Sequence, residues 1–189
     1  NYKRSFKEFA VLYRTNYQSR ALEEIFRFEK IPYIVIGGVE FYKRKEVKDI
    51  LAYLKLIANP MDEVSLLRII NFPQRGIGVT TIDRMIAFAR KLDISLYETT
   101  GRIFEVIDIK ERIQKNVKHF RALIDKYIEL KKQLSPSELT RALIDDLGII
   151  RLFKEEDTID SMNRLENINE LLNAITEYSQ KNPDATLDK

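Results

Sequence analysis

The chain is organised around Phe72-Pro73-Gln74-Arg75-Gly76-Ile77-Gly78-Val79-Thr80-Thr81, a stretch in which one predicted helix ends and another begins. Glycines on both sides of a single isoleucine let backbone N–H groups approach an anion. Thr80 or Thr81 can cap the following helix, whose positive dipole end then faces that anion, and Arg75 adds a positive charge. The alternative is a tight turn between two helices in which Ile77 is buried as the anchor. The stretch by itself leaves both interpretations open.

The composition is that of a globular domain. The chain has 189 residues, of which 44% are hydrophobic and 32% are charged, enough to bury a real core. Six glycines and five prolines favour long helices over many short strands. The net charge of +3 is modest, so a nucleic-acid role must rest on local patches. The lack of cysteine excludes disulfides and the usual structural zinc sites, and it is compatible with a reducing cytoplasm.

The N-terminal part predicts a β-α-β unit. Two apolar runs without a helical period, 9–13 and 33–36, predict buried strands, and the residues between them predict a helix that Thr15 or Asn16 caps and Ile31-Pro32 ends. Because one crossover helix cannot cover both faces of a sheet, these strands need partners. We therefore expect a small piece of an α/β domain, severed from a longer protein.

From residue 39 onward the hydrophobic period is helical. Predicted helices cover residues 47–58, 64–71, 82–89, a short segment opening at Ser95, 108–134, 135–148 and 159–181. The start of one of these helices is strongly marked, because Ser135 can cap it, Pro136 suits its first turn and Glu138 completes a capping box. The predicted fold class is mainly α: a helical domain attached to the small N-terminal β-α-β piece.

Several catalytic chemistries are excluded by what the chain lacks. No glycine-rich loop carries the lysine of a nucleotide-binding P-loop, and the single histidine, His119, cannot form a triad or a histidine metal cluster. Asp62-Glu63 follows no hydrophobic strand and is read as a solvated helix start. No apolar run is long enough to span a membrane. We therefore expect neither a metal site nor enzymatic activity from this chain alone.

Basic residues gather in two places, both near glycine-containing turns. The first cluster is Lys43, Arg44, Lys45 and Lys48, with Phe41 and Tyr42 beside it, and the second is Arg75, Arg84, Arg90 and Lys91. Such runs are often solvated helix faces. Two of them flanking a glycine turn also favour a surface that binds a nucleic-acid backbone, without base readout.

The motifs resemble those of a known family. The matching segments are Ala10 to Arg20, Ile31-Pro32-Tyr33, Gly37-Gly38, Phe41, Arg44, Glu46 to Leu54, Asn59-Pro60, Arg68 to Asn71, Pro73, Arg75 to Gly78, Thr81 and Arg164 to Asn167. In this order the sequence resembles the superfamily 1 DNA helicases of the UvrD/PcrA/Rep group. The resemblance covers nearly the whole chain and is most specific up to about residue 85.

The resemblance implies a division of the chain into two subdomains. Residues 1–38 look like part of the RecA-like subdomain 2A with helicase motif IV, and residues 39–189 look like the inserted helical subdomain 2B. By the same resemblance Tyr13 stacks on the adenine of ATP, and Arg14 is the catalytic arginine that reaches the γ-phosphate. These residue types suit the roles, because an aromatic face fits a purine and an arginine fork fits a phosphoryl group.

The resemblance also implies a DNA surface. The glycine turn of subdomain 2B contacts duplex DNA through its backbone in this family. That property places Arg75, Gly76, Ile77, Gly78, Thr80 and Thr81 on DNA phosphates, and Arg44 from the first basic cluster joins this predicted surface.

For the intact protein the resemblance implies an ATP-dependent 3′–5′ DNA helicase of repair or replication. We expect it to use ATP and Mg²⁺, whereas the chain alone is expected to hold neither. The expected partners are double-stranded DNA at a single-strand/duplex junction, the remaining helicase subdomains, and repair or transcription proteins, in the cytoplasm with the nucleoid. Two alternatives remain: a protein-docking platform without significant DNA binding, or part of a helicase–nuclease subunit.

Overall fold

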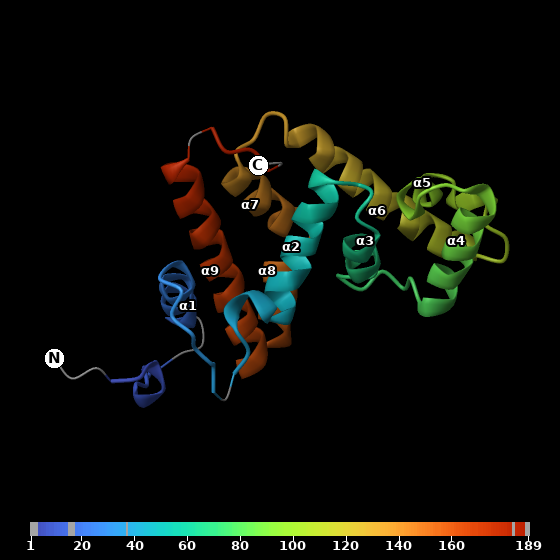
Figure 1. Ribbon diagram of the computed structural model, residues 1–189. Coiled ribbons are helices and arrows are strands. Elements are labelled where there is room, and N and C mark those ends of the chain that lie inside the picture. Colours follow the sequence, from blue (N-terminus) through green and yellow to red (C-terminus); the bar gives the residue numbers. More distant parts are fainter. Residues whose placement is uncertain (1–3, 15–17, 37, 183, 188–189) are drawn as a thin grey trace.

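The computed structural model describes residues 4–14, 18–36, 38–182 and 184–187, and across these residues the chain is helical and contains no β-strand (Figure 1). Its α-helices are α1 (Ser19–Phe28), α2 (Lys45–Ala58), α3 (Glu63–Ile69), α4 (Val79–Leu92), α5 (Leu96–Gly101), α6 (Glu111–Leu130), α7 (Pro136–Asp146), α8 (Ile149–Glu156) and α9 (Ile159–Lys181). Short 3-10 helices are η1 (Phe6–Glu8), η3 (Phe41–Lys43) and η4 (Ile103–Glu105). The predicted mainly α fold is confirmed. Within the described ranges, no helix has the length and hydropathy needed to cross a bilayer.

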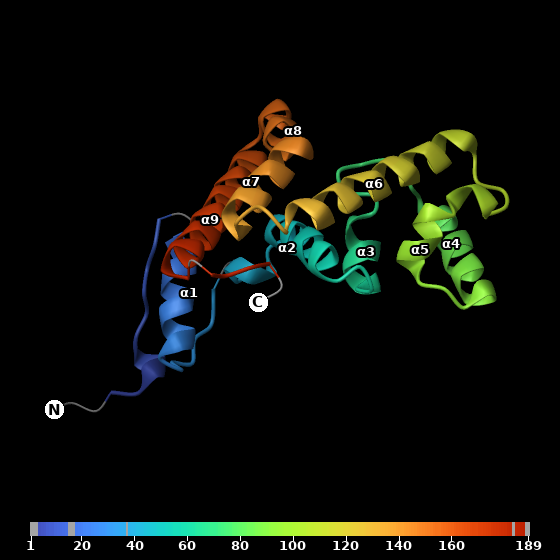
Figure 2. The ribbon, with the colours of Figure 1, turned by 90° about the horizontal axis from the view of Figure 1, so that it is seen from above.

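The helices form an elongated molecule. Helices α2, α7, α8 and α9 make a central lobe, and α4 and α5 make a distal lobe at the end opposite α1 (Figure 2). Helix α6 connects the two lobes: it begins at the distal lobe, where it packs against α5 and η4, and ends at the central lobe. Helix α3 packs against both α2 and α5. The glycine turn joins α3 to α4, so it lies where the two lobes meet.

Helix α2 is the centre of the hydrophobic core. It packs against α3, α6 and α9. Its fully buried apolar side chains are Val47, Ile50, Tyr53, Leu56 and Ile57. Burying each of the aliphatic ones stabilises the fold by roughly 1.5–3 kcal/mol. The helix predicted over residues 47–58 is confirmed.

Helix α6 is the long helix that the sequence predicts over 108–134, although it is shorter at both ends. Its buried residues, Val117, Phe120, Ile124 and Tyr127, recur at intervals of three and four, as required for one face of a helix. Tyr127 keeps its hydroxyl satisfied by donating to Asp146 Oδ2 at 2.9 Å. Burial is the main cause that raises the pKa of Tyr127.

The predicted start of α7 is confirmed in detail. Ser135 accepts a hydrogen bond from the Glu138 backbone N–H, and the Glu138 carboxylate accepts one from the Ser135 N–H at 2.9 Å. The Ser135 hydroxyl also donates to Glu138 Oε2 at 2.7 Å, and the bonds that this carboxylate accepts from the hydroxyl and the N–H of Ser135 lower the pKa of Glu138. Gly148 ends the segment with a φ of +65°, as its sequence position indicates. Helix α8 begins immediately afterwards and was not predicted.

The expected β-α-β unit is not confirmed. Its helix is present as α1, but residues 9–13 and 33–36 form no strand in the part of the chain that the structure describes. The predicted caps Thr15 and Asn16 lie outside the described residues. A strand needs a hydrogen-bonded neighbour, and none lies beside these segments among the residues that the structure describes. Their apolar side chains remain in solvent: Leu12 is 93% exposed and Ile34 is 83% exposed.

We predict that replacing Asp62 by Ala lowers the free energy of unfolding by about 1 kcal/mol, the usual effect of losing an N-cap. At the start of α3, Asp62 accepts hydrogen bonds from the Ser65 hydroxyl at 2.6 Å and from the Ser65 N–H at 3.0 Å. These two bonds lower the pKa of Asp62 from the ordinary value of 3.8. A carboxylate with a lowered pKa stabilises the fold above its ordinary pKa and loses that effect as the pH falls below it. Urea unfolding of the wild type and the variant at pH 7 and pH 3 tests this. A difference that persists unchanged in acid contradicts it.

Candidate nucleic-acid interface

One carboxamide fixes the shape of the glycine turn. Asn71 follows α3, and its Oδ1 accepts hydrogen bonds from the backbone N–H groups of Arg75 at 2.9 Å and Ile77 at 3.0 Å. From the other side, Asn116 Nδ2 of α6 donates to the Arg75 carbonyl at 2.7 Å. The turn is therefore held by side chains of two different elements, and its backbone does not depend on a bound anion for its shape.

The Arg75 side chain points into the protein. Its Nη1 donates to the carbonyls of Phe72 at 2.6 Å and of Ile69 and Pro73 at 3.2 Å, and its Nη2 donates to the Tyr53 hydroxyl at 2.8 Å. These acceptors cluster where α3 ends, which is where a positive charge is favourable. The guanidinium also lies over the Phe120 ring. This geometry gives Arg75 a structural role and does not favour the predicted phosphate contact by its side chain.

Ile77 is the anchor of the turn. It is 1% exposed and belongs to the hydrophobic core, as one of the two interpretations of the sequence predicted. Gly76 before it is exposed and has a φ of +71°, a conformation in which a side chain is strained. Because the Ile77 side chain points into the core, the glycines on either side of it, Gly76 and Gly78, lie at the surface.

Helix α4 begins with an open, exposed N-terminus. Gly78 is the N-cap residue with φ −85° and ψ 172°, and no side chain caps the helix. The predicted capping by Thr80 or Thr81 is therefore wrong: both residues lie inside the first turn of α4. The helix starts earlier because Gly78 takes up the extended conformation that an N-cap needs. In the described chain, the N–H groups of Gly78, Val79 and Thr80 have no acceptor, and all three residues are exposed.

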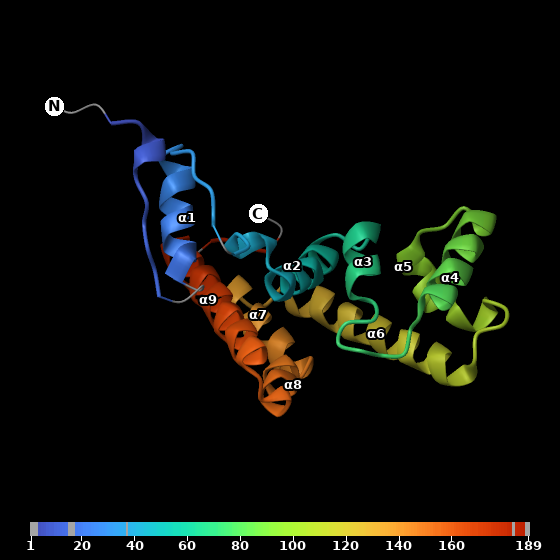
Figure 3. The ribbon, with the colours of Figure 1, turned by 90° about the horizontal axis from the view of Figure 1, so that it is seen from below.

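A groove lies beside the turn. Gln74, Arg75 and Gly76 form one wall, and Arg112, Asn116 and His119 of α6 form the other. It is open to solvent and has a volume of about 450 Å³. Figure 3 shows the connection from α3 to α4 passing alongside α6. These α6 residues were not predicted to belong to the site. Their spacing in the sequence places them on one face of a helix, but the sequence around them does not show that this face lies next to the turn.

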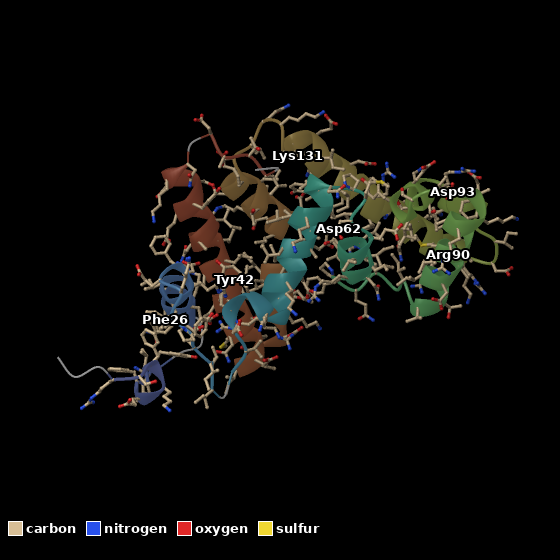
Figure 4. The ribbon with its side chains drawn as sticks, viewed as in Figure 1. Phe26, Tyr42, Asp62, Arg90, Asp93 and Lys131 are labelled. Atoms are coloured by element: carbon tan, nitrogen blue, oxygen red, sulfur yellow. The ribbon has the colours of Figure 1, made fainter. Side chains whose placement is uncertain are left out.

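The second basic cluster does not form one patch. Arg84 donates to the Asp108 carbonyl. Arg90 and Lys91 lie in the last turn of α4, where they complement the helix dipole at the end opposite Gly78. Figure 4 labels Arg90 on the distal lobe, together with Asp93, the residue that follows α4.

Arg44, predicted to contact DNA, is buried. Its Nη1 donates to Asn167 Oδ1 at 2.6 Å, its Nη2 to Ser19 Oγ at 2.8 Å, and its Nε to the Val39 carbonyl at 3.1 Å. Burial is the largest effect on this guanidinium and lowers the pKa of Arg44. The residue joins α1, α2 and α9, and its place in the fold does not favour the predicted DNA contact.

The same junction contains further buried polar contacts between α1 and the rest of the chain. Glu23 accepts hydrogen bonds from the Phe41 N–H at 3.0 and 3.1 Å, Arg20 pairs with Glu170 of α9 at 2.5 Å, and the Tyr42 hydroxyl donates to Glu24 at 2.7 Å. Phe26 and Tyr42, labelled in Figure 4, mark this end of the molecule. These contacts fix α1 against the helical domain.

Tyr13 and Arg14, the predicted nucleotide contacts, lie in the segment that leads to α1. Tyr13 is half-buried and Arg14 is exposed, and the Arg14 N–H donates to Gln18 Oε1 at 3.0 Å. Neither residue lines the groove beside the turn, and their nucleotide roles stay predictions. Among the residues with described positions, no three acidic or histidine side chains are grouped closely enough to hold a metal ion.

Comparison with known proteins identifies related sequences. A family model for the UvrD-like helicase C-terminal domain matches residues 1–188. The ATP-dependent DNA helicase PcrA of Bacillus subtilis is 37% identical over 185 residues, which are 98% of this chain and 25% of that protein. PcrA of Staphylococcus aureus strain Mu50 is 36% identical over 180 residues, 95% of this chain and 24% of that protein. The chain therefore spans about a quarter of the length of the curated relatives it matches.

We predict that Asn71→Ala destabilises the chain by about 2 kcal/mol, because two backbone N–H groups of the turn each lose a hydrogen bond that contributes about 1 kcal/mol. The matched control is Asn71→Asp, which keeps an acceptor oxygen in place and should cost much less. Urea unfolding followed by circular dichroism measures both variants. Equal stability of Asn71→Ala and the wild type would show that the carboxamide does not hold the turn.

We also predict that Arg44→Ala acts on stability and not on DNA binding. Loss of the hydrogen bonds that it donates to Asn167, Ser19 and Val39 should lower the free energy of unfolding by about 3 kcal/mol. The neighbouring Lys43→Ala, which removes an exposed charge, should change it by less than about 0.5 kcal/mol. Titrations of duplex DNA at several salt concentrations, with the Arg44 variant kept folded at low temperature, should give the slope of the wild type. A shallower slope contradicts the structural role.

Proposed function

Because this chain belongs to the family of UvrD-like helicase C-terminal domains, we propose that it serves in an ATP-dependent DNA helicase as the part that holds duplex DNA beside the single-strand junction. The observation that supports this most is the open N-terminus of α4 after the glycine turn. Its free N–H groups, the exposed Gly78 and the lack of any capping side chain leave room for a phosphate.

The physical basis is the partial positive charge at the start of a helix. The 14 residues of α4 give a well-formed dipole, and its N-terminal N–H groups can donate to phosphate oxygens. Thr80 and Thr81 in the first turn add hydroxyl donors. Contacts of this kind reach the DNA backbone and not the base edges, so the proposed binding is independent of sequence. It should also be weak, in the range of about 10⁻⁴ to 10⁻⁶ M that is typical of non-specific binding.

In this proposal residues 1–38 belong to subdomain 2A and residues 39–189 to subdomain 2B. The intact protein uses ATP and Mg²⁺ to move 3′–5′ along single-stranded DNA, in the cytoplasm with the nucleoid. The remaining subdomains supply the nucleotide site and cover the N-terminal segments. This last point is supported by the apolar side chains of Leu12, Ile34 and Ile36, which are 83–93% exposed in the described chain.

We predict that Gly78→Ser weakens duplex binding about three- to tenfold without loss of stability. The position has φ −85° and no atom within 4 Å of an added Cβ, so serine fits and can cap α4. Its hydroxyl then occupies an N–H group that the proposal assigns to a phosphate. Fluorescence anisotropy with a labelled duplex measures affinity, and urea unfolding measures stability.

The control is Gly78→Ala, which adds a similar volume but no acceptor and should keep more of the affinity than Gly78→Ser. The slope of log K against log salt should stay nearly constant in both, because no cation is removed. A serine variant that binds like the wild type argues against the turn as the phosphate site. A wild-type chain with no duplex affinity supports the docking-platform alternative.

A further inference from the structure

The groove beside the glycine turn contains basic side chains that make no contact with the turn. Arg75, which precedes Gly76 in the sequence, donates its hydrogen bonds to carbonyls at the end of α3 and to the Tyr53 hydroxyl. Across the groove, the exposed side chains of Arg112 and His119 make no hydrogen bond or ion pair with any residue whose position is described. A free guanidinium and a free imidazole therefore face the same opening as Gly76.

No carboxylate lines this groove, whose walls contain only neutral and basic side chains. The nearest acidic residue on α6 in sequence is Glu111, and it pairs with Lys115 at 2.7 Å. Arg112 has no ion pair in the described chain, whereas the arginines at 102, 121, 151 and 164 each pair with an acidic side chain. The groove is consequently suited to a polyanion and unsuited to a cation or an apolar peptide.

The spacing along α6 fits a regular polyanion. Arg112 and His119 are seven residues apart, which is about 10 Å along a helix. Each nucleotide of a DNA strand carries one phosphate, so two side chains this far apart on one helix face can contact different phosphates of the same strand. Asn116, between them in sequence, donates to the Arg75 carbonyl at 2.7 Å and so keeps α6 at a fixed separation from the turn.

We propose that Arg112 and His119 of α6 are additional contacts to the backbone of duplex DNA, extending the hold at the α4 N-terminus along the groove. The inference rests on the proposed function, because it assigns to α6 a share in the same duplex surface. In this proposal the two helices contribute different kinds of contact. Helix α4 contributes neutral N–H donors, and α6 contributes the ionic contact that was predicted from the sequence for Arg75.

The experiment compares single variants of the 189-residue chain, binding a labelled duplex at several salt concentrations. Arg112→Ala should lower the slope of log K against log salt by about 0.9 and weaken binding about fivefold to tenfold near 0.1 M salt. Arg112→Lys keeps the charge and should restore the slope. His119→Ala should weaken binding about threefold, as expected for one hydrogen bond. The matched control is Arg141→Ala on α7, another exposed arginine without an ion pair in the described chain, which should bind like the wild type.

The outcomes separate this inference from the proposed function. If Arg112→Ala keeps the wild-type slope and affinity while Gly78→Ser weakens binding, the α6 contact is overturned and the role of the turn stands. If Arg112→Ala lowers the slope and Gly78→Ser has no effect, α6 binds DNA and the assignment to the turn is overturned. A wild-type chain without duplex affinity overturns both. Equal losses in Arg112→Ala and Arg141→Ala would show a general charge effect and would also overturn the proposed groove.

Discussion

The need to satisfy the free carbonyls at the end of α3 determines how the glycine turn is built. Arg75 meets it by turning its guanidinium inward, onto the carbonyls of Ile69, Phe72 and Pro73 and the hydroxyl of Tyr53. Burial raises the pKa of Tyr53 to about 12, so this hydroxyl remains protonated at neutral pH and accepts from the guanidinium. With the end of α3 fixed in this way, Ile77 reaches the core and the next residue, Gly78, starts α4 at the surface.

Most of the fold is readable from the sequence because most of its helices carry a wide apolar face and a clear end signal. The spans of α2 and α6 follow from their hydrophobic period, and the start of α7 follows from Ser135 and Glu138. Helix α8 was not predicted from the sequence, because it is only 8 residues long and begins directly after Gly148 with no capping side chain. The N-terminal strands fail for a different reason: their apolar pattern is real, but a strand depends on neighbours that residues 9–13 and 33–36 do not have here.

The candidate site divides in the same way. The position of the turn follows from local sequence, and the burial of Ile77 agrees with one of the two interpretations that the stretch left open. The direction of an arginine side chain does not follow from local sequence, because it depends on acceptors that only the folded chain brings together. Arg44 donates to Asn167, which is 123 residues distant, and Arg75 donates to nearby carbonyls at the end of α3 and also to Tyr53, which is 22 residues distant. For the same reason the proposed DNA contacts of α6 could not be predicted from the sequence, because only the folded chain brings Arg112 beside Gly76.

These arrangements bear on how a chain with a net charge of only +3 would hold DNA in the proposed function. Many of its cations are used within the protein, in helix-end contacts, ion pairs and the α1 junction. Beside the glycine turn, the groups available to a polyanion are the N-terminus of α4 and the side chains of Arg112 and His119. Because affinity for DNA rises steeply with the number of phosphates neutralised, so few ionic contacts produce weak binding that salt readily disrupts. In the proposed helicase the duplex surface has to release each phosphate as the enzyme advances on the single strand, and contacts made mainly by neutral N–H donors satisfy that requirement better than a dense basic patch.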